Sequence, residues 1–107
     1  MAYTRDYAAQ EPARPAIDAH AGWLLLEFGA PWCPHCVGAQ PVVQQWQAEH
    51  ATDHIKIEDG KGRPLGRSFH VKLWPTLILL HNGEEVARVV RPREADDLLA
   101  LTALRER

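Results

Sequence analysis

The residues best suited to chemistry are the two cysteines, Cys33 and Cys36, in the segment Trp32-Cys33-Pro34-His35-Cys36. A C-x-x-C pair at the start of a helix has the spacing of a reversible dithiol and disulfide. The start of a helix offers unpaired N–H groups and the positive end of the helix dipole, and both favour a thiolate over a thiol. We therefore predict that Cys33 is the exposed nucleophile and that Cys36, one turn further along, is the resolving thiol.

The residues around the cysteines predict a strand followed by a helix. Residues 23–28 are almost continuously apolar, which is typical of a central strand buried on both faces. Gly29-Ala30-Pro31 ends this strand. A helix is then predicted over residues 33–50, with a kink at Pro41. The cysteines are thus expected at a strand-to-helix junction.

The rest of the chain predicts an α/β fold with a central mixed β-sheet and helices on both faces. Asn82-Gly83 between two apolar runs is typical of a type I′ hairpin turn. Strands linked by helical crossovers should be parallel, and the closing hairpin adds antiparallel strands. The other predicted elements are helices over residues 16–21, 63–70 and 93–107 and strands over 54–58, 76–80 and 84–90.

Length and composition indicate a single domain over residues 1–107. The chain is 46% hydrophobic and 24% charged, with a net charge of −2, so no nucleic-acid or membrane partner is expected. Residues 1–15 lack strong periodicity and an apolar signal-peptide run, and loose order, an edge element and a short helix all fit them. The simplest expectation is a cytoplasmic monomer with reduced cysteines, although a secreted chain without its signal would look the same.

Metal and cofactor chemistry find little support in the sequence. The histidines outside the cysteine motif are scattered and do not have the spacing of a metal cluster. Two cysteines and His35 could hold zinc or an iron–sulfur centre only with ligands from elsewhere. No metal and no cofactor are therefore expected. The scattered histidines are His20, His50, His54, His70 and His81.

Taken together, these features resemble the thioredoxin family from about residue 22 to the C-terminus. The resemblance rests on the segment 28–36, on Pro41, on Trp74-Pro75-Thr76 and on Asn82-Gly83, each in the place where thioredoxins carry the matching feature. It implies a thioredoxin fold and a thiol–disulfide oxidoreductase that reduces protein disulfides. It also implies a flavoprotein thioredoxin reductase as electron donor.

The resemblance implies that Pro75 is cis and packs beside the dithiol. A cis peptide bond costs little only before proline. It would turn the Trp74 backbone outward, where an extended substrate strand could pair with it. Trp32, which flanks the cysteines, would then form the substrate-binding surface with Trp74 and Pro75. An ordinary trans proline that opens a strand is the alternative.

Glu27 lies six residues before Cys33, where the family usually has a buried aspartate. The resemblance implies that this carboxylate accepts, directly or through water, the proton of the resolving Cys36. A carboxylate in an apolar strand is expensive unless it is neutral or paired. Its partner would be Lys56 or His54, and the alignment does not choose between them. The alternative is a solvent-facing position on the strand.

The residues between the cysteines depart from the usual Gly-Pro of thioredoxins. Pro34-His35 matches the pair found in the periplasmic disulfide-oxidase family. A histidine here can donate a hydrogen bond to the Cys33 thiolate or place positive charge near it. Stabilising the reduced form makes the disulfide more oxidising. The alternative is that His35 is an exposed spacer without electrostatic effect.

A second departure concerns the groove beside the active site. Arg91-Pro92 falls near the place where the family normally has a glycine, and an arginine there would narrow the groove and add positive charge. Two other functions stay open. Cys-Pro-x-Cys is typical of glutaredoxins, which use glutathione, but Trp32 and the absence of a Gly-Gly pair after the hairpin oppose that interpretation. Arg91 and the bulky Trp74 also fit a binding module in which turnover is incidental.

Overall fold

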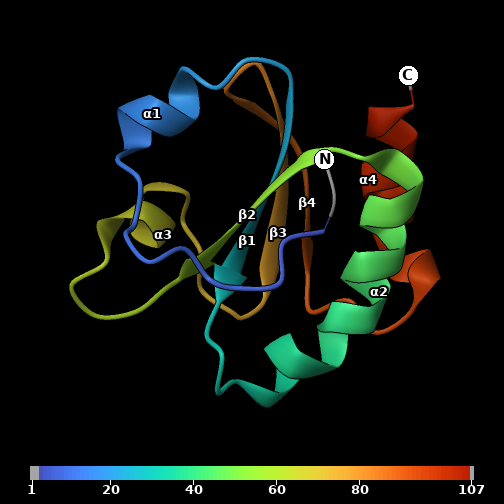
Figure 1. Cartoon of the computed structure of the whole chain (residues 1–107), viewed down its shortest axis with the longest axis horizontal. Helices are drawn as coiled ribbons and strands as arrows, with labels where there is room; N and C mark the ends of the chain where they lie inside the picture. Colours follow the sequence, from blue (N-terminus) through green and yellow to red (C-terminus); the bar gives the residue numbers. More distant parts are fainter. Residues whose placement is uncertain (1–2, 107) are drawn as a thin grey trace.

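The computed structural model describes residues 3–106 and arranges four strands in one sheet of order β2-β1-β3-β4. Helices cover both faces of the sheet, with α1 and α3 on one side and α2 and α4 on the other (Figure 1). This is the predicted α/β arrangement. The elements are α1 (Arg14–Asp18), β1 (Trp23–Gly29), α2 (Pro34–His50), β2 (Asp53–Glu58), α3 (Pro64–Ser68), β3 (Thr76–His81), β4 (Glu84–Val90), the 3-10 helix η1 (Ala95–Leu98) and α4 (Leu99–Arg105).

Strand β1 lies inside the sheet, as its apolar run predicted, and pairs in parallel with β2. Strand β3 runs antiparallel to β1, so the expectation of parallel helix-linked strands is wrong for β3. Phe28 of β1 pairs with both Ile57, near the end of β2, and Thr76, the start of β3. The connection therefore returns to the end of the sheet that it left. Helix α3 has five residues and a rise of about 7.5 Å, too short to cross the sheet.

The hairpin between β3 and β4 turns at Asn82 and Gly83, as predicted. Both residues have positive φ, 52° and 84°, which is the backbone of a type I′ turn. Gly83 is also needed for space, because a Cβ at this position would collide with the carbonyl oxygen of Asp18 at the end of α1. The turn thus fixes the hairpin and seats it against α1.

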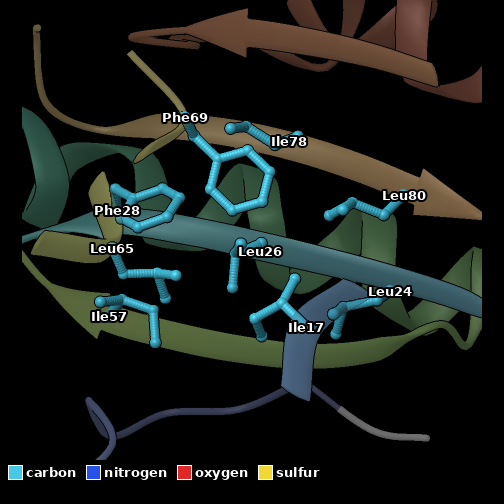
Figure 2. Packing of buried hydrophobic residues seen from close by; sticks show 9 residues of the cluster. All are labelled: Ile17, Leu24, Leu26, Phe28, Ile57, Leu65, Phe69, Ile78 and Leu80. Carbon is cyan, nitrogen blue, oxygen red and sulfur yellow. The ribbon is translucent and has the colours of Figure 1, made fainter. Parts of the chain in front are cut away.

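Alternation along β1 sends its side chains to two separate cores. Leu24, Leu26 and Phe28 face α1 and α3, where they form the cluster in Figure 2. Leu25 faces the other side, where it packs with residues of α2, η1 and α4. Glu27 alternates with the same set as Leu25, so its carboxylate lies beneath α2. The first cluster comprises Ile17, Leu24, Leu26, Phe28, Ile57, Leu65, Phe69, Ile78 and Leu80.

The terminal helix differs from the continuous helix predicted over residues 93–107. It begins as the 3-10 turn η1 and becomes α-helical only at Leu99, while residue 107 lies outside the described residues. Glu94 and Asp97 form a reciprocal capping box, and the Asp97 carboxylate also accepts the N–H of Arg93. These bonds draw the first turn tight. Within residues 3–106, no helix is long and apolar enough to cross a membrane.

The N-terminal segment before α1 is held along the outer edge of β2. Thr4 donates its backbone N–H to His54 Nδ1 at 3.0 Å and its hydroxyl to the His54 carbonyl at 2.6 Å. The N–H of Ala8 donates to the carbonyl of Lys56 at 2.8 Å. Of the possibilities left open for this region, the edge element describes residues 4–8, and a helix begins only at Arg14; residues 1 and 2 lie outside the described part.

Candidate active site

Cys33 is the N-cap of α2, the position predicted for it. Its Sγ accepts a hydrogen bond from the backbone N–H of Cys36 at 3.3 Å, and both cysteines are free thiols. The expectation of an exposed Cys33 is wrong, because the residue is only 5% exposed. Cys33 and Cys36 pack with Ala30 and the partly buried Trp74. The Cys33 sulfur is therefore largely covered by its neighbours, and a client has to approach it closely.

Cys36 is 1% exposed and lies one turn deeper than Cys33. Burial, reinforced by the neighbouring Cys33 side chain, raises the pKa of Cys36 to about 12. A Cβ at Gly29 would come within 2.6 Å of the Cys36 sulfur, so only glycine allows β1 and the thiol to lie this close. The Cys36 thiol is thus protonated at neutral pH.

Iodoacetamide near neutral pH should modify Cys33 before Cys36, because alkylation requires a thiolate and Cys36 remains a buried thiol. Below a pKa of about 12, the thiolate fraction of Cys36 rises about tenfold with each pH unit. Labelling of Cys36 in the Cys33→Ser variant should follow that slope between pH 7 and 9. Peptide mapping by mass spectrometry measures both rates. Faster labelling of Cys36 in the parent protein would reverse the assignment of nucleophile and resolving thiol.

Glu27 is fully buried, which rules out the solvent-facing alternative. Its Oε1 lies 2.9 Å from His54 Nε2, and its Oε2 accepts a hydrogen bond from Gln40 Nε2 at 2.7 Å. Because His54 Nδ1 accepts the N–H of Thr4, the ring proton sits on Nε2 and points at Glu27. Of the two partners left open by the sequence, His54 thus pairs with the carboxylate directly. Lys56 is linked to the Glu27 carboxylate only through Gln40, which bonds with both side chains.

Gln40 joins the groups around the resolving cysteine. Its Oε1 accepts hydrogen bonds from Lys56 Nζ at 2.9 Å and from the hydroxyl of Tyr3. Its Nε2 donates to Glu27 and, at 2.8 Å, to the carbonyl of Cys36. The sequence analysis missed Gln40. The available signal was its spacing, one helical turn after Cys36 on the side of α2 that faces the sheet.

A cavity of about 530 Å³ lies behind Cys36, and Tyr7 and Lys56 form part of its lining. Tyr7 and Cys36 line this cavity together; burial foremost, with the nearby Cys36 and Glu27, raises the pKa of Tyr7 above its usual range. Lys56 Nζ lies 4.6 Å from the Tyr7 ring centroid. Burial lowers the pKa of Lys56, against the opposing effect of Glu27. Tyr7 was also missed, because nothing in residues 1–15 indicates that they reach this site.

The outer face of the site is formed by Trp32, Trp74 and Pro75. The Trp74–Pro75 peptide bond is cis, as the resemblance implied. Trp74 donates its indole N–H to Asp59 at 2.9 Å, and its ring meets that of Trp32 edge-on, with centroids 5.6 Å apart. Trp32 is 70% exposed. The structure therefore brings the predicted substrate-binding residues together beside Cys33.

Arg91 lies at the same loop, where its Nε donates to the Trp74 carbonyl at 2.7 Å. One lone pair of the main-chain acceptor expected to meet a client strand is thus already used within the protein. His35 is exposed and lines a small cavity together with Arg91. Among the hydrogen bonds of residues 3–106, none joins His35 to Cys33, so the effect of His35 on the thiolate stays a prediction.

A helix-capping dithiol beside a cis-proline loop, on a mixed sheet covered on both faces, defines a thioredoxin-type redox site. The family model Thioredoxin matches residues 9–103, so the chain belongs to the thioredoxin family. The structure is similar to that of thioredoxin 2 from Pseudomonas aeruginosa PAO1 in its reduced form, with a TM-score of 0.86 and 48% identity over 97% of this chain and 98% of that one.

Curated relatives include thioredoxins and much longer proteins. The chain is 37% identical over 84 residues to thioredoxin from Chlamydia trachomatis, which is 76% of this chain and 80% of that protein. It is 34% identical over 92 residues to protein disulfide-isomerase from Gallus gallus, 79% of this chain. The match covers only 18% of the length of that isomerase.

Proposed function

We propose that this protein is a thiol–disulfide oxidoreductase that reduces disulfides in client proteins. The observation that carries the proposal is the pair of free thiols with unequal settings, Cys33 capping the helix and Cys36 buried beside a network that can accept its proton. Membership in the thioredoxin family supports the same activity.

The reaction takes two exchanges. The Cys33 thiolate attacks one sulfur of the client disulfide, the client S–S bond breaks, and one client sulfur leaves as a thiolate that takes up a proton. Cys36 then loses its proton and attacks Cys33 Sγ, which releases the second client thiolate. The client gains two electrons and two protons, and the protein is left with a Cys33–Cys36 disulfide.

Glu27 is the proposed proton acceptor for Cys36. The carboxylate lies close enough for its charge to contribute to the raised pKa of that thiol. His54 donates to one carboxylate oxygen and Gln40 to the other, which fixes the orientation of the acceptor. A proton can pass from sulfur to carboxylate directly or through one water molecule.

The proposed setting is a cytoplasmic monomer that a flavoprotein thioredoxin reductase returns to the dithiol. Similarity to thioredoxins over most of the chain supports this donor over glutathione. On the client side, the surface formed by Trp32, Trp74 and Pro75 would bind the chain that flanks the disulfide. The electron donor and the client-binding surface are proposals beyond family membership, and each is tested separately.

Reduction of insulin by dithiothreitol tests the proposed activity. The protein should accelerate the precipitation of insulin chains, and Cys33→Ser should lower the rate to that of dithiothreitol alone, because no attacking thiolate remains. Replacing dithiothreitol by NADPH and thioredoxin reductase, or by glutathione and its reductase, identifies the donor. A rate equal to that of dithiothreitol alone in the parent protein would favour the binding module.

A further inference from the structure

Arg91 is held in a fixed position beside the dithiol. It follows β4 with a positive φ of 54°. Its backbone N–H donates to the carbonyl of Pro75 at 2.9 Å, and its Nε donates to the carbonyl of Trp74 at 2.7 Å. Two bonds to adjacent carbonyls of the cis-proline loop therefore orient an exposed side chain.

These bonds leave the outer edge of the Arg91 guanidinium free. A guanidinium has five N–H donors in a rigid plane, and among the described residues 3–106 Arg91 donates from its side chain only through Nε. Arg14 and Arg88 are ion-paired with Asp18 and Glu85, whereas within residues 3–106 no carboxylate pairs with Arg91. The two terminal nitrogens together match the geometry of a carboxylate.

The residues that line the space next to Arg91 include two arginines and no carboxylate. A cavity of about 190 Å³ runs between the start of α2 and the loop after β4, and its lining includes Arg91 and Arg93 but no acidic residue. The nearby Asp97 carboxylate is turned to the backbone N–H groups of Arg93 and Glu94. The full lining is Pro34, His35, Gly38, Arg91, Pro92 and Arg93.

We propose that Arg91 selects client disulfides whose attacked cysteine is flanked by aspartate or glutamate. The client carboxylate binds the two terminal nitrogens of Arg91 while Nε stays on the Trp74 carbonyl. The Trp74 carbonyl already accepts one hydrogen bond from Arg91, and the carboxylate contact gives the client a polar anchor at the same loop. The inference rests on the proposed disulfide reductase function.

Reduction of matched disulfide peptides tests this selectivity. Two peptides differ only in glutamate or glutamine next to the attacked cysteine, and stopped-flow fluorescence gives the second-order rate constant for each with the pre-reduced protein. An exposed ion pair contributes only a small binding free energy, so the rate constant of the parent should be about three- to fivefold higher for the glutamate peptide at low salt. The preference should shrink at 0.5 M salt, which shortens the screening length to a few ångströms, roughly 4 Å.

Arg91→Gln should bring the ratio of the two rate constants close to one. Arg67→Gln, an exposed arginine on α3 across the sheet, is the matched control and should keep the parental ratio. Arg91→Gly provides a second variant whose backbone accepts the positive φ.

The two possible failures give different results. A parental ratio in both Arg91 variants, or an equal loss in Arg67→Gln, overturns the role of Arg91 while leaving the reductase activity in place. If the pre-reduced parent protein reduces neither peptide, the proposed function itself has failed.

Discussion

Replacing Glu27 by glutamine should slow resolution of the mixed disulfide by at least about tenfold, while the initial attack by Cys33 stays within about twofold. General acid–base groups typically contribute about 10²–10⁴-fold, and a water-mediated bypass would leave part of that rate. The Cys36 thiol has a pKa of about 12, so at neutral pH its proton must be accepted before sulfur attacks. Attack by Cys33 needs no such transfer.

Rapid-mixing experiments with a client disulfide separate the two steps, because acid quenching followed by mass spectrometry counts the mixed disulfide. The Glu27→Gln variant should accumulate that species and the parent should not. Glu49→Gln, an exposed glutamate on the same helix α2, is the matched control and should behave like the parent. Resolution at the parental rate in Glu27→Gln would exclude the carboxylate as proton acceptor.

The stability of Glu27→Ala gives an independent check on the same site. Alanine leaves the His54 Nε2–H and the Gln40 amide without their buried acceptor, and each unsatisfied group costs about 1–3 kcal/mol. The free energy of unfolding should therefore fall, although a buried carboxylate is removed. Urea unfolding measures this change, and an unchanged midpoint would show that water satisfies the two donors.

Replacing Pro34-His35 by Gly-Pro should make the disulfide harder to reduce and decrease the thiolate absorbance at neutral pH. The change removes a side chain that can place positive charge beside the Cys33 sulfur at the helix start. About 30 mV corresponds to about 1.4 kcal/mol for a two-electron couple, so one lost interaction shifts the potential by roughly 30–60 mV.

The two readouts must move together, since one interaction causes both. Equilibration with glutathione gives the potential, and ultraviolet absorbance gives the thiolate on the same protein. His35→Gln, which keeps Pro34 and the backbone, separates charge from geometry and should reproduce most of the shift. If the potential changes without the absorbance, backbone geometry at the helix start has to replace the electrostatic explanation.

The sequence predicted the junction of β1 and α2 well because its signals are local. Residues 23–50 contain a continuous apolar run, then Gly-Ala-Pro, then a helical pattern. This order predicts a buried strand followed directly by a helix. Glu27 was identified through the resemblance, from its place six residues before Cys33, and the surrounding apolar strand favoured its burial. The direction of β3 was predicted wrongly because it depends on the length of α3. A longer helix would have carried the chain to the other end of the sheet, and the order of elements does not show that length.

The residues that complete the site could not be predicted because their contacts are distant in sequence. Tyr7 reaches Cys36 only after residues 4–8 have attached to β2, and no pattern in the chain indicates that docking. The burial of Cys33 depends likewise on Trp74, which lies 41 positions further along the chain. Periodicity shows which face of an element is apolar, but not which distant side chain covers it.

The attachment of residues 4–8 to β2 also affects association between chains. Strand β2 is at an edge of the sheet, where unpaired N–H and C=O groups invite a strand of another molecule. Thr4 and Ala8 already occupy two of its carbonyls, and the opposite edge, β4, carries Glu84, Glu85 and Arg88. Both edges of the sheet are thereby protected from adding a strand of another molecule, or of a further copy of this chain, as the start of an aggregate.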